Sequence, residues 1–214
     1  KIKNKINYNS ISSYLHLGYI PSNKTIYQKV LKVNPGSYIV YQDNEIKEKR
    51  FWNPKDKIKS TTFDDFNSSK QKLKLLLQDS IKSRLISDVP IGTFLSGGTD
   101  SSIISSIAQE VNGSPINTFS IGFEEAKYNE SEHAKKVANY LGTSHNEFIL
   151  TEKEAIDQLE NIIEHFDEPF ADQSALPTML VSKMAKKHVT VCLSGDGGDE
   201  LFMGYGAYNW AKRI

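Results

Sequence analysis

The second half of the chain alternates short β-prone runs with stretches of helical hydrophobic spacing. The apolar runs predict four strands, at residues 91–95, 116–123, 145–150 and 188–193. The stretches between them predict helices at 102–110, 131–141, 152–166 and 178–187, with an irregular Pro-containing stretch at 167–177. Alternating strands and helices are typical of βαβ units. We therefore expect an α/β domain with a doubly wound, mostly parallel sheet and helices on both faces.

The first half of the chain has a different pattern. Residues 63–86 carry apolar side chains at helical spacing, which predicts one long amphipathic helix. Residues 53–62 are polar and aperiodic, as is typical of a linker. Residues 11–17 predict a short helix, and the β-prone runs on either side of Asp43 and Asn44 predict an antiparallel hairpin. We therefore expect two domains, residues 1–52 and 63–214, joined by the linker.

Composition and charge exclude several classes of protein. No apolar run approaches the ~18 residues that span a membrane, and the N-terminus lacks the apolar core of a secretory signal. The single cysteine, Cys192, can build neither a disulfide nor a multi-thiolate metal site within the chain. Residues 1–60 hold 12 Lys and Arg against 4 Asp and Glu, but these are scattered and lack an aromatic-basic pattern. We expect a cytoplasmic protein with no membrane or nucleic-acid partner.

Residues 95–102 (Leu-Ser-Gly-Gly-Thr-Asp-Ser-Ser) join a predicted strand to a predicted helix. Backbone N–H groups at a helix start favour anions, and adjacent glycines let a phosphate come close. The loop matches neither the Walker A signature nor the dinucleotide-binding Gly signature. Without the Walker lysine, the phosphate charge needs another partner, and Asp100 indicates a divalent cation. The structural alternative is a Gly-rich helix start capped by Ser or Asp.

A second loop repeats this pattern. Residues 194–200 (Ser-Gly-Asp-Gly-Gly-Asp-Glu) follow the predicted strand that ends at Leu193. Ligands of open parallel sheets bind at the carboxyl ends of the strands. We therefore expect Leu95 and Leu193 to end neighbouring parallel strands, and both loops to face one crevice. Asp100 and Asp199 would repel each other there unless a cation bridges them, and Mg²⁺ binds such carboxylates together with phosphate oxygens.

The first loop resembles the pyrophosphate loop of the N-type ATP pyrophosphatases. Four further segments extend the resemblance to the glutamine-dependent asparagine synthetases: residues 83–92, 119–123, 167–172 and 194–200. Residues 11–52 resemble the end of that family's glutaminase domain. The resemblance implies a truncated, adenine nucleotide alpha hydrolase-like ATP pyrophosphatase domain in residues 63–214. It implies that residues 1–52 are a β-hairpin remnant of an α+β glutaminase domain.

This resemblance implies an ATP-dependent amide ligase. In the family, Mg·ATP activates the side-chain carboxylate of aspartate as β-aspartyl-AMP and pyrophosphate is released. Ammonia derived from glutamine then displaces AMP, which gives asparagine. The implied substrates are ATP, aspartate and this ammonia, and the implied cofactor is Mg²⁺. The resemblance is also compatible with a homodimer of the full-length enzyme.

Matched positions carry the family's roles onto this chain. Asp100 and Asp199 would bind Mg²⁺ and offset charge on the leaving group. Asp196 stands where the family has an acidic catalytic residue, often Glu, that is linked to deprotonation of the incoming ammonia. Nucleotide contacts, including Phe94 and Ile121 beside the adenosine, would come from Phe94, Ser96, Gly97, Gly98, Asp100, Ser101, Ser102, Ile121, Ser194 and Gly195.

Some family features are missing from the chain. The N-terminal nucleophilic Cys of the glutaminase is absent, and the family's catalytic Lys lies beyond Ile214. Cys192 lies in an apolar run and is interpreted as a buried structural thiol. The chain does not begin with Met, as expected of an internal fragment, although removal of the initiator Met gives the same result. We expect residues 1–214 alone to bind Mg·ATP weakly and to form no asparagine from glutamine.

Three alternatives stay open at this point. Some synthetases place Arg near the position of Gln173, so the same chemistry on a sugar acid or a peptide carboxylate is one alternative. A tRNA-modifying ATP pyrophosphatase is another, although residues 121–200 hold 7 Lys and Arg against 16 Asp and Glu, which is unfavourable for binding RNA. A non-catalytic nucleotide-binding relative would be expected to lack Asp100 or Asp199.

Overall fold

The computed structural model describes residues 5–58, 65–125 and 129–211, which fall into two compact units. One unit contains the described residues up to Ile58 together with Glu160–Ser174. The other contains Asp65–Leu159 and the described residues from Ala175 onward. The end of the predicted linker (residues 59–62) and the predicted helix start at Phe63 lie outside the described residues. Each unit is considered by itself below.

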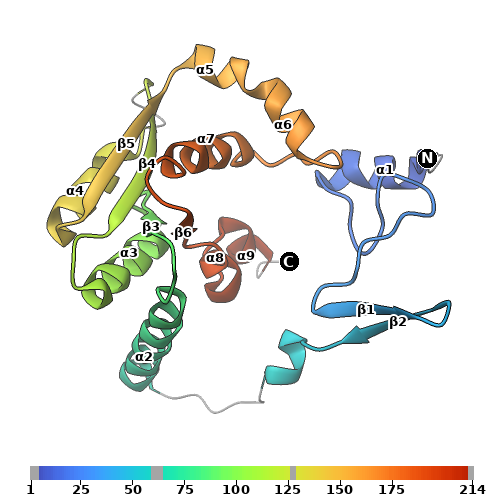
Figure 1. Ribbon diagram of the computed structural model, residues 1–214, viewed down its shortest axis with the longest axis horizontal. Coiled ribbons are helices and arrows are strands. Elements are labelled where there is room, and N and C mark those ends of the chain that lie inside the picture. The colour runs from blue at the N-terminus through green and yellow to red at the C-terminus, as the bar shows by residue number, and fades with distance from the viewer. Residues whose placement is uncertain (1–4, 59–64, 126–128, 212–214) are drawn as a thin grey trace. The chain divides into compact units, whose positions relative to one another are not determined.

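The larger unit is built on a four-stranded sheet with the strand order β5-β4-β3-β6 (Figure 1). Its strands are β3 (Ile91–Phe94), β4 (Asn117–Phe123), β5 (Ser144–Leu150) and β6 (Val191–Leu193), and every pairing is parallel. In the register, Thr93 lies opposite Thr118 on one side and Leu193 on the other. The predicted α/β fold with a parallel sheet is confirmed.

Helices cover both faces of this sheet. Successive side chains of a strand point to opposite faces. Thr93 faces α3 (Thr99–Asn112), where its hydroxyl is 2.8 Å from that of Ser105. Phe94 packs on the other face with Phe119 and with α7 (Ala175–Ala185). Helix α4 (Ser131–Leu141) packs on the buried Leu95 just beyond β3.

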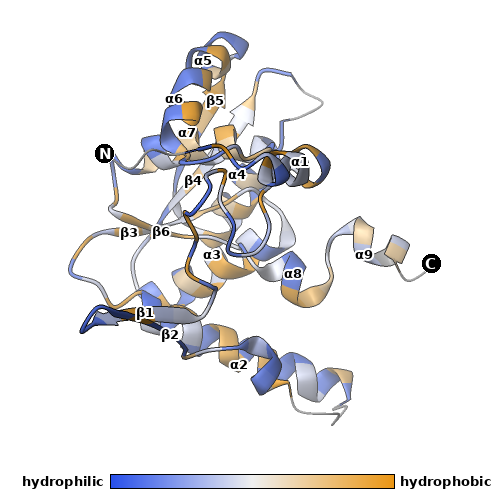
Figure 2. Cartoon of the chain, turned by 90° about the vertical axis from the view of Figure 1, so that its right-hand side faces the viewer, coloured by the Kyte–Doolittle hydropathy of each residue, from blue (hydrophilic) through white to orange (hydrophobic). Residues whose placement is uncertain are grey.

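The long predicted helix before the sheet is α2 (Phe66–Arg84). Its N-cap is Asp65, whose side chain accepts hydrogen bonds from the backbone N–H groups of Asn67 and Ser68. The helix packs on α3 through the buried Ile81. Apolar and polar residues alternate along it (Figure 2), and its Leu75 and Leu76 are exposed. Only one side of the predicted amphipathic helix is therefore packed in this unit.

The predicted helix at 152–166 is wrong, because two helices occupy this stretch. They are α5 (Glu152–Asp157) and α6 (Leu159–His165). The N–H of Gln158 donates to the carbonyls of both Ala155 and Ile156, and this tight turn closes α5. The spacing of hydrophobic residues alone does not predict such a break.

Several boundaries differ from the prediction. Helix α3 runs from Thr99 to Asn112, beyond the predicted residues 102–110 at both ends. Helix α7 begins at Ala175, so the irregular stretch is shorter than predicted and Pro177 lies in the first helical turn. Proline is tolerated there because the N–H it lacks would have no intrahelical partner. The last strand begins at Val191 rather than at residue 188. The N–H groups of His188 and Val189 both donate to the Ala185 carbonyl at 2.9 Å, so these residues form a turn that follows α7 and are not part of the strand. Short helices α8 (Gly198–Phe202) and α9 (Gly206–Ala211) follow β6.

The smaller unit contains α1 (Tyr8–Leu17), the hairpin β1 (Ser37–Gln42) and β2 (Glu45–Arg50), and the short 3-10 helix η1 (Pro54–Lys57). The hairpin pairs antiparallel as predicted, and both turn residues, Asp43 and Asn44, have positive φ. Among the described residues of this unit, Ile20 is the only buried hydrophobic side chain. No helix of either unit, over the residues described, is both long and apolar enough to cross a membrane.

Candidate functional site

Two Gly-rich loops leave the same end of the sheet. The first follows β3 and the second follows β6, and these strands are parallel neighbours. The prediction that Leu95 and Leu193 end neighbouring parallel strands is therefore confirmed. Because carboxyl ends of parallel strands share one edge of the sheet, the residues of both loops meet at one place.

The first loop is held by its own hydroxyl groups. The Ser96 and Ser101 hydroxyl oxygens are 2.9 Å apart, and the Ser101 hydroxyl also donates to the Gly98 carbonyl at 3.2 Å. The Gly98 N–H donates to Ser96 Oγ at 3.2 Å. Gly98 is the N-cap of α3 and brings no side-chain cap, so the N–H groups of the first helical turn are available to an anion.

Gly97 has a structural reason to be glycine. Its φ is +85°, a conformation that residues with a side chain rarely adopt. A Cβ at this position would lie 2.7 Å from the backbone N of Ala134 and 2.8 Å from the carbonyl carbon of His133. The glycine therefore lets the loop pack directly against the first turn of α4.

The second loop packs directly against the first. A Cβ on Gly195 would lie 2.9 Å from both the Cβ of Asp100 and the backbone N of Ser101. The Asp100 carboxylate also contacts Gly198 at the start of α8. Within the second loop, the Ser194 hydroxyl donates to Asp196 Oδ2 at 2.9 Å. The two loops thus form one continuous surface around Asp100.

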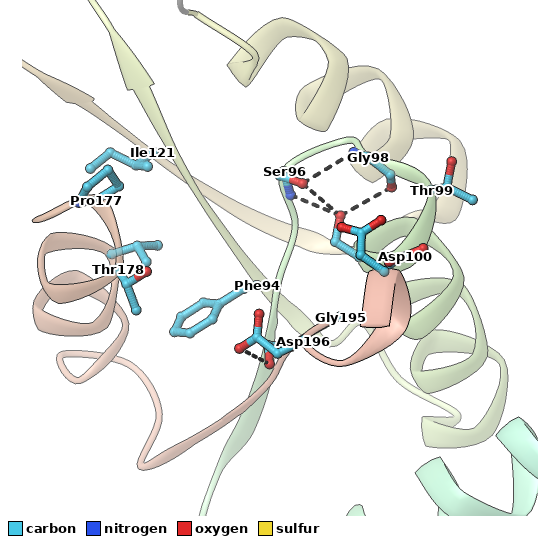
Figure 3. A pocket seen from close by; sticks show the side chains of 14 residues that line it. Phe94, Ser96, Gly98, Thr99, Asp100, Ile121, Pro177, Thr178, Gly195 and Asp196 are labelled. Carbon is cyan, nitrogen blue, oxygen red and sulfur yellow. Dashed lines mark hydrogen bonds between the residues drawn. The ribbon is translucent and has the colours of Figure 1, made fainter. Parts of the chain in front are cut away.

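This surface is one wall of a cavity of about 460 Å³ (Figure 3). The loop wall is polar and carries three carboxylates, whereas the opposite wall is mostly apolar and comes from the sheet and α7. The lining residues are Phe94, Ser96, Gly98, Thr99, Asp100, Ser101, Ile121, Pro177, Thr178, Val181, Ser194, Gly195, Asp196 and Asp199. An apolar slot beside an anion-binding helix start suits a ligand with an aromatic ring at one end and phosphates at the other.

The lining includes every predicted site residue except Gly97 and Ser102. Gly97 lies behind the loop against α4, and the Ser102 hydroxyl oxygen is buried without a hydrogen-bond partner. The analysis of the sequence missed Thr99, which lies inside the motif, and Pro177, Thr178 and Val181. Pro177 was predicted to lie before the helix, and all three were missed because nothing in the local pattern links α7 to the loops.

The charge of the cavity requires a counter-ion for any phosphate. Asp100, Asp196 and Asp199 line it, and no Lys or Arg is among its described lining residues. Over the described chain, no cluster of three or more His, Cys, Asp or Glu side chains has the geometry of a metal site. A divalent cation would therefore need ligand oxygens in addition to Asp100 and Asp199. This fits Mg²⁺, which is usually bound by one or two carboxylates together with phosphate oxygens and water.

Cys192 lies in β6 directly before the second loop. Its thiol is half-buried, not fully buried as predicted, because β6 is an edge strand of the described sheet. It packs against the cluster that contains Phe119 and Val181, and burial raises its pKa to about 11. A thiol with this pKa is almost entirely protonated at neutral pH and is a poor nucleophile.

We expect Cys192 to react slowly with iodoacetamide in the folded protein. At pH 8 a thiol with a pKa of about 11 is ~0.1% thiolate, so the reaction should be about a hundredfold slower or more than that of an ordinary exposed cysteine. Alkylation followed by mass spectrometry measures the rate, with the urea-unfolded protein as the control. Equal rates in the folded and unfolded protein would contradict the burial of this thiol.

Comparisons with known proteins agree on one family. The family model described as asparagine synthase matches residues 72–214. Asparagine synthetase (glutamine-hydrolyzing) 1 of Bacillus subtilis (strain 168) is 38% identical over 205 residues, which cover 95% of this chain and 32% of that protein. Putative asparagine synthetase (glutamine-hydrolyzing) 2 of Methanocaldococcus jannaschii is 40% identical over 206 residues, which cover 95% of this chain and 39% of that protein. The chain thus spans about a third of the length of these curated relatives.

Among solved structures, similarity is found to an NH3-dependent NAD synthetase from Campylobacter jejuni, in complex with the nitrate ion. The TM-score is 0.44 at 16% sequence identity, and the match covers 64% of this chain and 60% of that one.

Proposed function

Since this chain belongs to the asparagine synthase family, we propose that its cavity binds ATP and that the protein is an ATP-dependent amide ligase of the asparagine-synthetase type. The observation that carries this proposal is the junction of the two loops, which puts the open start of α3 and the carboxylates of Asp100 and Asp199 around one cavity. The proposed reaction activates the side-chain carboxylate of aspartate as β-aspartyl-AMP with release of pyrophosphate. Ammonia derived from glutamine then displaces AMP to give asparagine.

The nucleotide would lie across the cavity. Its phosphates would accept hydrogen bonds from the N–H groups at the start of α3, and from the Ser96 and Ser101 hydroxyls after these turn away from each other. The adenine ring would lie against Phe94 and Ile121, with Pro177 and Val181 completing the apolar wall. The α-phosphate would then lie between the apolar wall and the start of α3, where a carboxylate can attack it.

Asp100 and Asp199 would hold the Mg²⁺ that accompanies the nucleotide. When bound, this ion supplies positive charge to the leaving pyrophosphate. The protein keeps Asp100 in place by packing its carboxylate against Gly198 and its Cβ close to Gly195. A rigid carboxylate positions the ion without loss of side-chain entropy during the reaction.

Asp196 is the proposed proton acceptor for the second half of the reaction. The Ser194 hydroxyl holds one of its oxygens, at 2.9 Å, and leaves the other oxygen for the incoming nitrogen. The nucleophilic nitrogen must lose a proton when the C–N bond forms and AMP leaves. A carboxylate on the cavity wall can accept that proton.

Exchange of pyrophosphate into ATP tests this proposal. We expect exchange that requires both Mg²⁺ and aspartate in the protein that contains this chain, because adenylate formation is reversible and releases pyrophosphate. Exchange with a sugar acid or a peptide carboxylate, and none with aspartate, would favour the same chemistry on another substrate. Absence of exchange with every carboxylate tested would refute the proposed function.

A further inference from the structure

One hydroxyl group lies in the otherwise apolar wall of the candidate ATP cavity. This wall belongs entirely to the larger unit, and its described residues come from β3, β4 and α7: Phe94, Ile121, Pro177, Thr178 and Val181. Among them, only Thr178 has a side chain that can form hydrogen bonds. Figure 3 shows Thr178 on the same side of the cavity as Ile121 and Pro177, opposite Ser96 and Asp100. A polar group is therefore present where the adenine ring of the nucleotide would lie.

Thr178 belongs to the face of α7 that packs on the sheet. Thr178, Val181 and Ala185 follow one another at intervals of three and four residues, so they lie along one face of the helix. Val181 and Ala185 are buried in the cluster that contains Phe119. Thr178 continues this face at the N-terminal end of α7, where it is exposed and lines the cavity. Its position on this face directs its side chain toward the cavity.

The Thr178 hydroxyl is available to a ligand. A threonine in a helix can donate to a backbone carbonyl of the preceding turn, but this hydroxyl has no hydrogen-bond partner within the part of the chain that the structure describes. Two threonines in the strands of the same unit differ in this respect. The Thr93 hydroxyl is paired with Ser105 at 2.8 Å, and the Thr118 hydroxyl with Thr143 at 2.9 Å.

An adenine ring against this wall needs a hydrogen-bond acceptor. Its exocyclic amino group is a donor, and a donor that leaves water without finding a partner lowers the affinity. The carboxylates of the cavity are on the loop wall, where the phosphates and Mg²⁺ would lie. The oxygen of a hydroxyl group can accept a hydrogen bond from the amino group while its own hydrogen points to water.

We infer that the Thr178 hydroxyl accepts a hydrogen bond from the exocyclic amino group of adenine. Thr178 thereby helps the cavity to select ATP over purine nucleotides that lack this amino group. The inference rests on the proposed function for the identity of the nucleotide. Because the base is remote from the reacting α-phosphate, the contact is the same before and during the reaction. Its loss should therefore weaken ATP binding and leave the chemical step unchanged.

The variants Thr178→Val and Thr178→Ser test this inference in the intact protein that contains this chain. Valine keeps the shape of the side chain and removes the hydroxyl, whereas serine keeps the hydroxyl. Calorimetric titration measures the Kd of Mg·ATP and of the Mg²⁺ complex of purine riboside triphosphate, which is ATP without its amino group. The wild type and Thr178→Ser should bind ATP about five- to tenfold more tightly than this analogue, as expected for one hydrogen bond. Thr178→Val should bind both nucleotides as weakly as the wild type binds the analogue.

Ser182→Ala is the matched control. It removes a hydroxyl one turn further along α7, which lines a different cavity together with Lys186 and Thr190. The Kd of both nucleotides should therefore stay at the wild-type value. Equal weakening of both nucleotides in Thr178→Val would overturn the inference, because a lost bond to the amino group affects ATP alone. Unchanged ATP binding in Thr178→Val would overturn it as well.

Pyrophosphate exchange separates this inference from the proposed function. In Thr178→Val the KM for ATP should rise about five- to tenfold, with kcat changed less than twofold. If the wild type binds Mg·ATP but shows no exchange, the proposed function fails, and the titrations alone decide the inference. If the wild type does not bind Mg·ATP, both are refuted.

Discussion

Asp100→Asn and Asp199→Asn should each lower aspartate-dependent pyrophosphate exchange by more than about tenfold, or ~1.4 kcal/mol of transition-state stabilisation. Both carboxylates line the cavity, where no Lys or Arg is among the described lining residues. An amide keeps the size of the side chain and removes the charge that would hold Mg²⁺. Without Mg²⁺ the effect should reverse, and both variants should bind ATP as well as the wild type or more tightly, because a charge that repels the phosphates is gone.

Glu200→Gln is the control for these two variants. Glu200 follows Asp199 in α8 but is not among the residues that line the cavity, and its carboxylate accepts a hydrogen bond from the Tyr205 hydroxyl at 2.9 Å. A glutamine oxygen can still accept that bond, so exchange should stay near the wild-type rate. Exchange at the wild-type rate in both Asn variants would refute the assignment of the metal-binding residues.

Gly97→Ala should lower the free energy of unfolding by about 3 kcal/mol. A residue with a side chain at φ +85° costs roughly 1–2 kcal/mol, and contacts of 2.7–2.8 Å with the backbone of α4 add an overpacking cost of about 1–3 kcal/mol. The neighbouring backbone cannot move aside as a flexible side chain would, so the loop or α4 must shift. Urea denaturation followed by circular dichroism measures the change.

Gly142→Ala separates the two costs. Gly142 ends α4 with a similar φ of +69°, but a Cβ there would meet no atom within 4 Å. It should therefore carry only the conformational cost, about 1 kcal/mol. Equal losses of stability in the two variants would mean that the close approach between the loop and α4 contributes nothing.

Much of the site could be read from short stretches of sequence. A β-prone run followed by glycines, serines and an aspartate specifies a strand, a tight loop and a helix start, and all three depend on neighbouring residues alone. The same pattern at residues 188–200 led to the expectation that Asp199 faces the same crevice as Asp100, because parallel strands present their carboxyl ends at one edge, and both residues line one cavity. The four strands and most helices of the larger unit were predicted for the same reason. The exceptions are the break at Gln158, the boundaries of α3 and around α7, and the short helices α8 and α9.

The sequence showed which residues belong to the motif but not what each of them contacts. Gly97 and Ser102 belong to the loop, yet neither lines the cavity. The constraint on Gly97 is set by the backbone of His133 and Ala134, which come from another helix. The exposure of Cys192 likewise depends on its position in the edge strand of the described sheet. No local pattern contains this information.

The sequence by itself determined the alternating strands and helices, the two Gly-rich loops and the carboxylates in them, since periodicity, helix starts and turn residues are properties of adjacent positions. Only the tertiary structure decided that β6 lies next to β3, that Pro177 and Thr178 of α7 form the opposite wall of the cavity, and that residues 160–174 pack with the N-terminal residues through Lys32 and Glu168. The physical reason is the same in each case. Such contacts join residues far apart in the sequence, 100 positions for Ile91 and Val191 and 136 positions for Lys32 and Glu168. Their free energy comes from packing and charge between surfaces that the chain brings together only when it folds.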